Sequence, residues 1–190
     1  MTEINGLRDA ITAHFAGGRF DEGDRLLVEF GTGLAEHVRL ECQGNHLFYQ
    51  KKLQEAVRCY EAAITLKPDY PISRYQYLVG TQEEREGNFV AAFKRYQAAI
   101  GVEPTFVDPF VELGGLLAKV GDLAGAAQCY RDAVRLEPTD VANHYNLKSI
   151  LSRLAEVSPE QHREELAAAE AAYEDAARNH PRKDLRTHQW

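Results

Sequence analysis

The cysteines of this chain could bind a metal or carry out redox chemistry. Cys59 and Cys129 occupy equivalent places in two copies of a repeated segment, and Cys42 stands alone. No Cys-x-x-Cys or His-x-x-x-His pair is present, although zinc sites typically use such spacings. If the copies stack about one helix diameter apart, about 20 Å separates Cys59 from Cys129, which is too far for a disulfide. We therefore expect small structural thiols, with no metal site and no cofactor.

Carboxylates gather at Glu83, Glu84 and Glu86, where general acid–base chemistry could be considered. Neighbouring positions on a helix point in different directions, so we expect solvated or structural side chains. Glu83 merits a test, because related copies carry Leu47 and Leu117 at its position. The chain lacks a Gly-x-Ser-x-Gly turn, a phosphate-binding glycine loop and a dinucleotide fingerprint. The sequence therefore predicts a protein that is not an enzyme.

Charge and hydropathy limit the partners and the surroundings of the chain. A formal net charge of −7 and a pI near 5.5 argue against binding to nucleic acid, which requires clustered lysine and arginine. No apolar run approaches the roughly 18 residues that cross a bilayer, and residues 1–5 lack the parts of a signal peptide. We expect a cytoplasmic protein with neither a membrane nor a nucleic-acid partner.

The C-terminal residues differ in charge from the rest of the chain. Four cations against one carboxylate give residues 178–190 a local charge of +3, and the only tryptophan, Trp190, lies beside them. Two interpretations stay open. The segment is either a solvated terminus or a docking peptide that lies in a groove of this chain or of a neighbour.

A pattern of glycine, alanine, tyrosine, alanine and proline recurs three times at the same internal spacings. The prolines lie 36 and then 34 residues apart, a period typical of stacked helix pairs. Small glycine and alanine side chains let helices approach within about 8–10 Å, and the tyrosine shares a helical face with both alanines. Proline then ends the second helix. The three copies are Gly44, Ala56, Tyr60, Ala63 and Pro68; Gly80, Ala92, Tyr96, Ala99 and Pro104; and Gly114, Ala126, Tyr130, Ala133 and Pro138.

Short turns inside the copies complete each helix pair. Gly87-Asn88 and Gly121-Asp122 place a glycine where a helix ends in the left-handed conformation and an Asn or Asp where the next helix needs an N-cap. Lys51-Lys52 replaces this pair in the first copy, so we expect strain or a different geometry there. Asp108, which precedes Pro109, is interpreted as another N-cap.

These residues resemble the tetratricopeptide repeat family, whose pattern has a glycine in the first helix, alanine, aromatic and alanine in the second, and a closing proline. The resemblance implies an all-α fold, a right-handed α-solenoid of stacked antiparallel helix pairs. Weaker matches at both ends extend the pattern, so we predict a single domain over 1–190. Its parts are a degenerate opening repeat at 4–36, clear repeats at 37–70, 73–106 and 107–140, a divergent closing repeat at 141–181 and a basic tail at 182–190.

The outer repeats depart from the pattern at identifiable places. Gly17-Gly18 divides the opening repeat into two helical stretches. In the closing repeat Lys148 replaces the expected glycine, while Ala169, Tyr173 and Ala176 keep the signature of a second helix. Terminal repeats are usually atypical because they cap the stack.

In the resembled family the first helices line a concave face, which implies where a partner would bind. Projected onto that arrangement, this sequence mixes aromatic anchors with cations that could pair with carboxylates. Such a lining suits a peptide with acidic and apolar side chains, although the aromatics could instead pack helix to helix. The predicted protein- or peptide-binding residues are Asn45, Phe48, Tyr49, Arg74, Tyr77, Arg85, Val111, Lys119, Tyr145 and Arg153.

The sequence thus predicts a non-catalytic protein-protein interaction module, acting as an adaptor or assembly scaffold through its concave groove. One alternative is a chaperone for an extended client segment. A second is a regulatory subunit that acts on an enzyme in trans. A third is self-assembly, in which repeat faces or the tail join copies into a homo-oligomer.

Overall fold

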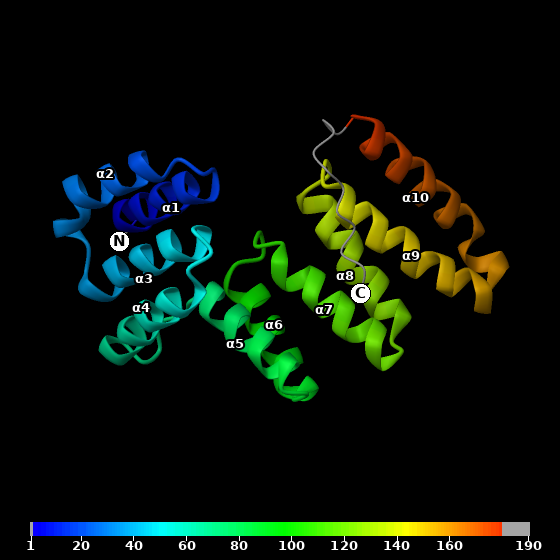
Figure 1. Ribbon diagram of the computed structural model, residues 1–190, viewed down its shortest axis with the longest axis horizontal. Helices are drawn as coiled ribbons and strands as arrows, with labels where there is room; N and C mark the ends of the chain where they lie inside the picture. Colours follow the sequence, from blue (N-terminus) through cyan, green and yellow to red (C-terminus); the bar gives the residue numbers. More distant parts are fainter. Residues whose placement is uncertain (1, 180–190) are drawn as a thin grey trace. The chain divides into compact units, whose positions relative to one another are not determined.

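The structure is a computed structural model that describes residues 2–179. Over this range it contains helices and no strand, which confirms the predicted all-α fold (Figure 1). A short 3-10 helix spans Gly31–Gly33. The α-helices are α1 (Thr2–Ala16), α2 (Phe20–Phe30), α3 (Glu36–Tyr49), α4 (Leu53–Leu66), α5 (Ser73–Arg85), α6 (Phe89–Val102), α7 (Asp108–Val120), α8 (Leu123–Leu136), α9 (Val141–Val157) and α10 (Pro159–Asn179).

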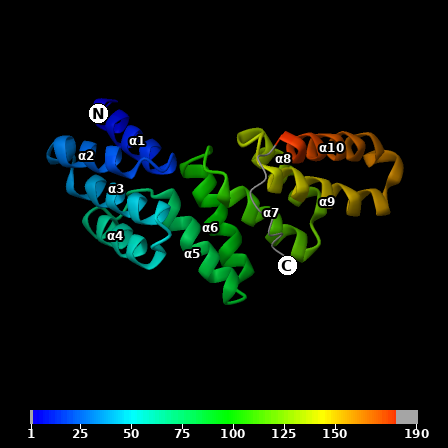
Figure 2. The same cartoon turned by 45° about the horizontal axis from the view of Figure 1, so that its top comes forward.

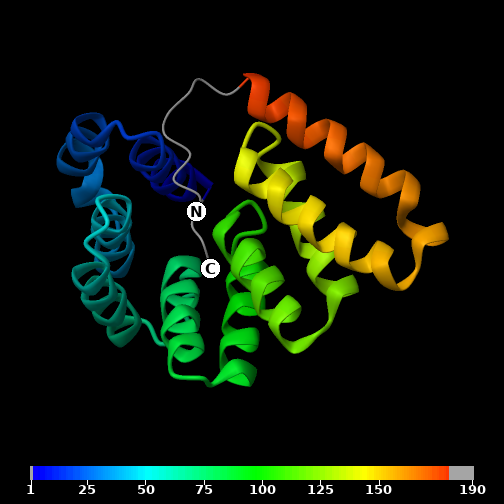
Figure 3. The ribbon, with the colours of Figure 1, turned by 45° about the vertical axis from the view of Figure 1, so that its right-hand side comes forward.

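The chain divides into two compact units, residues 1–82 and 83–190. In the first unit α1 packs against α2 and α3, and α3 packs against α4 (Figure 3). In the second unit each helix from α6 to α10 packs against the next one along the chain, and α9 and α10 lie side by side (Figure 2). Helix α5 contains the boundary, because Gln82 belongs to the first unit and Glu83 to the second. The packing of consecutive helices is the solenoid arrangement expected from the repeats.

The repeated alanines and tyrosines form the buried face of the second helices. Every alanine and tyrosine of the three copies is buried, from Ala56 on α4 to Ala133 on α8. A Cβ atom added to Gly44 would overlap the ring of Tyr60, and one added to Gly114 would lie 3.0 Å from the ring of Tyr130. Glycine is therefore required at position 44 and favoured at position 114, where the tyrosine ring meets the first helix, as the residue pattern predicts.

The inner turns have the predicted left-handed glycines, but one of the two predicted N-cap residues makes no capping hydrogen bond. Gly87 and Gly121 have φ values of 82° and 89°, and Lys51 adopts the same left-handed conformation with φ 63°, which costs a residue with a Cβ atom about 1–2 kcal/mol. Asp122 caps α8 by accepting a hydrogen bond of 2.9 Å from the Gly125 N–H. Asn88 stands at the N-cap of α6 but makes no capping hydrogen bond.

The side chain of Asn88 has a different partner, which explains the missing cap. Its Nδ2 donates to Glu83 Oε2 at 2.8 Å across the turn between α5 and α6. The predicted N-cap at Asp108 is also wrong by one position, because Val107 is the N-cap and Asp108 is the first residue of α7. Proline lacks an N–H and is tolerated in a first helical turn, so Pro109 allows the helix to begin before it.

The opening helix pair has the glycine and the aromatic residue exchanged between its helices. Helix α1 ends at Ala16 and α2 begins at Phe20, so Gly17-Gly18 breaks the helix as predicted. A Cβ atom on Gly23 of α2 would overlap the buried ring of Phe15 on α1. The contact between a glycine and an aromatic ring is thus kept, but here the aromatic residue lies on the first helix and the glycine on the second. This exchange is how the opening repeat departs from the pattern.

The closing pair consists of longer helices than the repeats. Helix α10 begins at Pro159, the expected first helical position, and Ala169 is buried. Across residues 2–179 none of the helices combines the length and the apolar character that crossing a bilayer requires. The basic tail predicted at 182–190 lies outside the described residues.

Candidate protein-binding surfaces

The predicted binding residues all lie on the first helices of the repeats, but their surroundings differ. Some are buried within a unit, and others face solvent. The following paragraphs treat each unit by itself. Asn45, Phe48 and Tyr49 lie on α3; Arg74, Tyr77 and Arg85 on α5; Val111 and Lys119 on α7; and Tyr145 and Arg153 on α9.

Asn45 serves as a buried polar link between three helices of the first unit. Its side chain is 1% exposed. The Nδ2 atom donates to Thr12 Oγ1 on α1 at 3.1 Å, and Oδ1 accepts from the Tyr60 hydroxyl on α4 at 2.9 Å. Burial is the main reason that the pKa of Tyr60 lies well above its ordinary value. Both amide atoms are satisfied internally, so Asn45 stabilises the packing of the unit.

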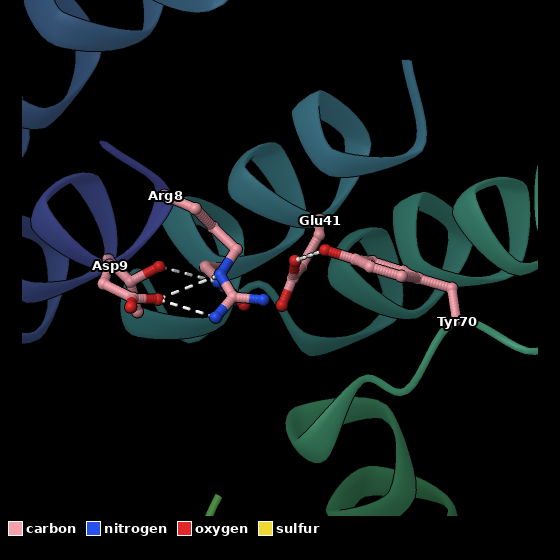
Figure 4. Close-up of polar contacts among 6 residues, drawn as sticks. Arg8, Asp9, Glu41 and Tyr70 are labelled. Carbon is pink, nitrogen blue, oxygen red and sulfur yellow. Dashed lines mark hydrogen bonds and ion pairs between the residues drawn. The ribbon is translucent and has the colours of Figure 1, made fainter. Parts of the chain in front are cut away.

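A second set of polar side chains in the first unit surrounds the buried carboxylate of Glu41. Glu41 on α3 is buried and accepts a hydrogen bond of 2.5 Å from the Tyr70 hydroxyl. Figure 4 shows the Arg8 guanidinium between the side chains of Asp9 and Glu41, and Arg8 Nη2 lies 2.7 Å from Asp9 Oδ1. Burial lowers the pKa of Arg8, but hydrogen bonds to Asp9 and Tyr70 and the negative charge of Glu41 together raise it by more, so the pKa lies above its ordinary value. The residue pattern did not predict this group, because it combines α1, α3 and the α4–α5 loop.

Four predicted residues meet in what we call the Arg74 cluster, which consists of Phe48, Tyr49, Arg74 and Tyr77. Arg74 is 5% exposed, and its Nη2 donates to the Tyr49 hydroxyl at 2.7 Å. Its guanidinium carbon lies 5.3 Å from the centre of the Tyr49 ring and 6.0 Å from that of Phe48. The Phe48 and Tyr77 rings meet edge to face at 6.1 Å. Cation–π contacts of this kind stabilise a fold when they are desolvated.

The predicted cation Lys119 of the second unit is paired with a carboxylate of the chain itself. Its Nζ lies 2.5 Å from Glu84 Oε1, and Glu84 Oε2 accepts from the Tyr96 hydroxyl at 2.8 Å. Burial raises the pKa of the nearby Glu112 carboxyl, and the Glu84 and Asp108 charges raise it further. Val111 is half-buried and packs against the apolar core. The internal carboxylate therefore competes with any external carboxylate for Lys119.

Exposed aromatic surface occurs in the closing helix pair, in a group that we call the Tyr145 cluster: Tyr145, Lys148 and Tyr173. Tyr145 is 51% exposed, and its ring centre lies 5.9 Å from that of Tyr173. Lys148 Nζ lies 4.4 Å from the centre of the Tyr173 ring and 5.4 Å from that of Tyr145. The sequence analysis predicted Tyr145 as a binding residue but did not include Lys148 or Tyr173. The replacement of the signature glycine by Lys148 was the signal that could have identified both.

Two exposed arginines complete the set of predicted residues. Arg85 is the last residue of α5, and Arg153 lies on α9, five residues after Lys148. Within residues 2–179 neither side chain has a hydrogen bond or an ion pair to another side chain. They differ in this respect from Arg74 and Lys119, whose charges are engaged inside their own units.

The described residues contain no cluster of three or more side chains that could hold a metal ion. The thiols of Cys42, Cys59 and Cys129 are free. Burial raises the pKa of Cys42 to about 12 and that of Cys129 to about 11. Because the thiolate is the reactive form, neither of these two cysteines is an activated nucleophile.

Comparisons with known proteins agree with the geometry of the helix pairs. A family model described as "TPR repeat" matches residues 44–76, and one described as "Tetratricopeptide repeat" matches residues 108–140. These segments contain the first and third of the three predicted copies, which confirms the resemblance. No match is found among curated proteins.

Solved structures with a similar fold include several of MamA. A crystal structure of MamA is 15% identical, covers 87% of this chain and 93% of its own, and has a TM-score of 0.54. Another crystal structure of the MamA protein is also 15% identical and covers 96% and 99%, with a TM-score of 0.53. MamA 41-end from Desulfovibrio magneticus RS-1 is 17% identical and covers 96% and 99%, with a TM-score of 0.52. At these identities the similarity concerns the fold.

Proposed function

We propose that this chain of tetratricopeptide repeats is a non-catalytic scaffold that binds a peptide or protein segment with the first helices of its repeats. Helix pairs of this kind serve as protein-interaction surfaces, and the family matches and the fold support that general role. The finer proposal concerns the chemistry of the bound segment. It would carry carboxylates together with apolar side chains.

The exposed arginines Arg85 and Arg153 are the observation that carries this proposal. Each presents a guanidinium to solvent without a carboxylate partner within residues 2–179. Arginine pairs with carboxylates through two parallel hydrogen bonds, which gives both affinity and orientation. The chain has a formal charge of −7, so two arginines on first helices that have no carboxylate partner are candidates for binding one from a partner.

The Tyr145 cluster supplies the apolar part of the proposed site. Half of the Tyr145 side chain is exposed beside a second tyrosine and a lysine. Tyrosine and arginine are enriched at the centres of protein interfaces, since they bury a large area and still make polar contacts. The Arg74 cluster contributes mainly by holding α3 against α5, because Phe48 and Arg74 are already buried.

A peptide-selection experiment tests the proposal. Random peptides are displayed and selected on the full chain, and the dissociation constant of the best peptide is measured by fluorescence anisotropy. We expect the selected peptides to combine acidic and apolar residues. The double variant Arg85→Glu/Arg153→Glu should bind at least about tenfold more weakly, which corresponds to about 1.4 kcal/mol.

A matched variant separates the site from the net charge. Arg58 on α4 and Lys94 on α6 are exposed cations on second helices, so Arg58→Glu/Lys94→Glu changes the total charge equally. This control should bind within about twofold of the unaltered chain, since isolated surface charges contribute little. Equal weakening in both variants, or selected peptides without acidic residues, would count against the proposed site. Circular dichroism checks that both variants are folded.

A further inference from the structure

An open cleft of about 820 Å³ lies in the second unit, and its lining includes none of the residues proposed above. Its walls come from the turn between α8 and α9 and from the last turns of α10. Leu136, Pro138, Ala172 and Ala176 give it apolar surface, and Asn179, the last described residue, also lines it. A volume of this size lies within the range of clefts that hold small molecules or a few side chains.

The charged residues that line the cleft are all acidic. Glu137, Asp140 and Asp175 contribute carboxylates, and the lining includes no lysine or arginine. Asp140 Oδ1 accepts from the Asn143 N–H at 2.8 Å as the N-cap of α9. Asp175 lies 3.9 Å from Arg178 Nη2, a long and exposed contact that leaves most of its charge available.

Burial and mutual repulsion make it unfavourable for the carboxylates of the cleft to be negatively charged at the same time. Burial raises the pKa of the Glu137 carboxyl, and the Asp140 and Asp108 charges add to this effect, which a hydrogen bond from Asn143 opposes. His144 is buried, with Nε2 2.9 Å from the carbonyl oxygen of Pro138, so its imidazole is held by the backbone. A cationic group entering the cleft would relieve the repulsion between the carboxylates.

We propose that this cleft binds the segment 180–190 of the same chain. Three observations converge on this occupant. The described chain leaves α10 at Asn179, on the edge of the cleft. The segment carries Arg182, Lys183 and Arg186 against Asp184 alone, so its charge complements that of the lining. Leu185 and Trp190 add apolar side chains that suit the apolar part of the walls.

Chain connectivity favours binding within one molecule over binding between two. Only two residues separate Asn179 from Arg182, and a short linker gives an effective concentration in the millimolar range. Eleven residues extend at most about 40 Å, which is ample to follow the cleft. Contacts that would be weak between separate molecules are therefore sufficient here.

Trp190 is the only tryptophan, which makes its fluorescence a direct report on this segment in the full chain. We expect raised Trp190 anisotropy at low salt and a decrease in 1 M salt, where the screening length is about 3 Å. Glu137→Lys/Asp175→Lys should lower the anisotropy to the high-salt value. The matched control Glu164→Lys/Glu170→Lys changes two exposed carboxylates of α10 outside the cleft lining and should leave the anisotropy high.

Two further measurements decide between the possible outcomes. Arg182→Glu/Lys183→Glu/Arg186→Glu alters only the segment and should reproduce the loss of anisotropy, even if the cleft variant proves unstable. The anisotropy should also stay constant over a 100-fold dilution of a chain that light scattering shows to be monomeric. Equal Trp190 signals in all variants would overturn the proposal. A signal that falls on dilution would overturn it as well, because a second copy would then supply the segment.

Discussion

The α3–α4 and α9–α10 pairs place different residues against a tyrosine of the second helix. In α3–α4 the residue is Gly44, and the ring of Tyr60 is fully buried. In α9–α10 it is Lys148, whose ammonium group lies over the ring of Tyr173. At the same signature position, a buried aromatic contact in one pair thus corresponds to a half-exposed cation–aromatic surface in the other.

This difference separates a fully buried tyrosine from tyrosines with accessible ring surface in a single repeat chain. The ring of Tyr60 is buried and its hydroxyl donates to Asn45, so this side chain has no accessible surface for a partner. Tyr173 and Tyr145 keep accessible ring surface beside Lys148.

The largest expected effect comes from adding a methyl group at the tight contact. Gly44→Ala places a Cβ atom inside the ring of Tyr60, which cannot move without losing its bond to Asn45. We expect the free energy of unfolding to fall by about 3 kcal/mol, at the upper end of the range for overpacked cores. Urea denaturation followed by circular dichroism measures it. An unchanged midpoint would mean that the helices separate easily.

A smaller effect is expected from removing one hydroxyl group from each tyrosine in turn. Tyr60→Phe leaves the Oδ1 atom of Asn45 buried without its donor, and an unsatisfied buried acceptor costs about 2 kcal/mol. Tyr173→Phe should change the stability by less than about 0.5 kcal/mol, since Tyr173 is only half-buried. Equal losses from the two substitutions, measured by the same urea titration, would remove the distinction between the tyrosines.

The smallest expected effect tests the charge over the Tyr173 ring. Lys148→Met keeps an unbranched side chain and removes the ammonium group, so the cation–π contact is lost while packing is preserved. We expect a decrease of about 0.5 kcal/mol in the free energy of unfolding, typical of exposed contacts of this kind. Thermal melting in low and high salt measures it. A stabilised variant would show that the lysine is present for a partner and not for the fold.

The repeat pattern predicted helices and turns well because each signature residue acts locally. Glycine at a left-handed turn and alanine under a tyrosine ring depend on neighbours at fixed sequence distances, and Gly121 and Ala126 behave as expected. Asn88 and Asp108 deviate for equally local reasons: a competing carboxylate on Glu83, and a proline that lets the helix begin earlier.

The polar surroundings of the candidate site could not be predicted from the same pattern. Whether Arg74 faces solvent or the Tyr49 hydroxyl depends on how α5 sits against α3, and periodicity does not specify that geometry. Lys119 likewise depends on Glu84, which is 35 residues earlier in the chain. Arg153 depends on no such distant group, because its side chain is exposed and has no side-chain hydrogen bond or ion pair within residues 2–179, and its role in binding stays a prediction.

Because the Cys42 thiol is buried, its rate of alkylation reports local opening of the first unit. A maleimide or iodoacetamide added to the native chain meets Cys59 and Cys129, which are partly accessible, whereas Cys42 reacts only after α3 separates from α1. The rate of the third alkylation therefore records how often the first unit opens, without any engineered label.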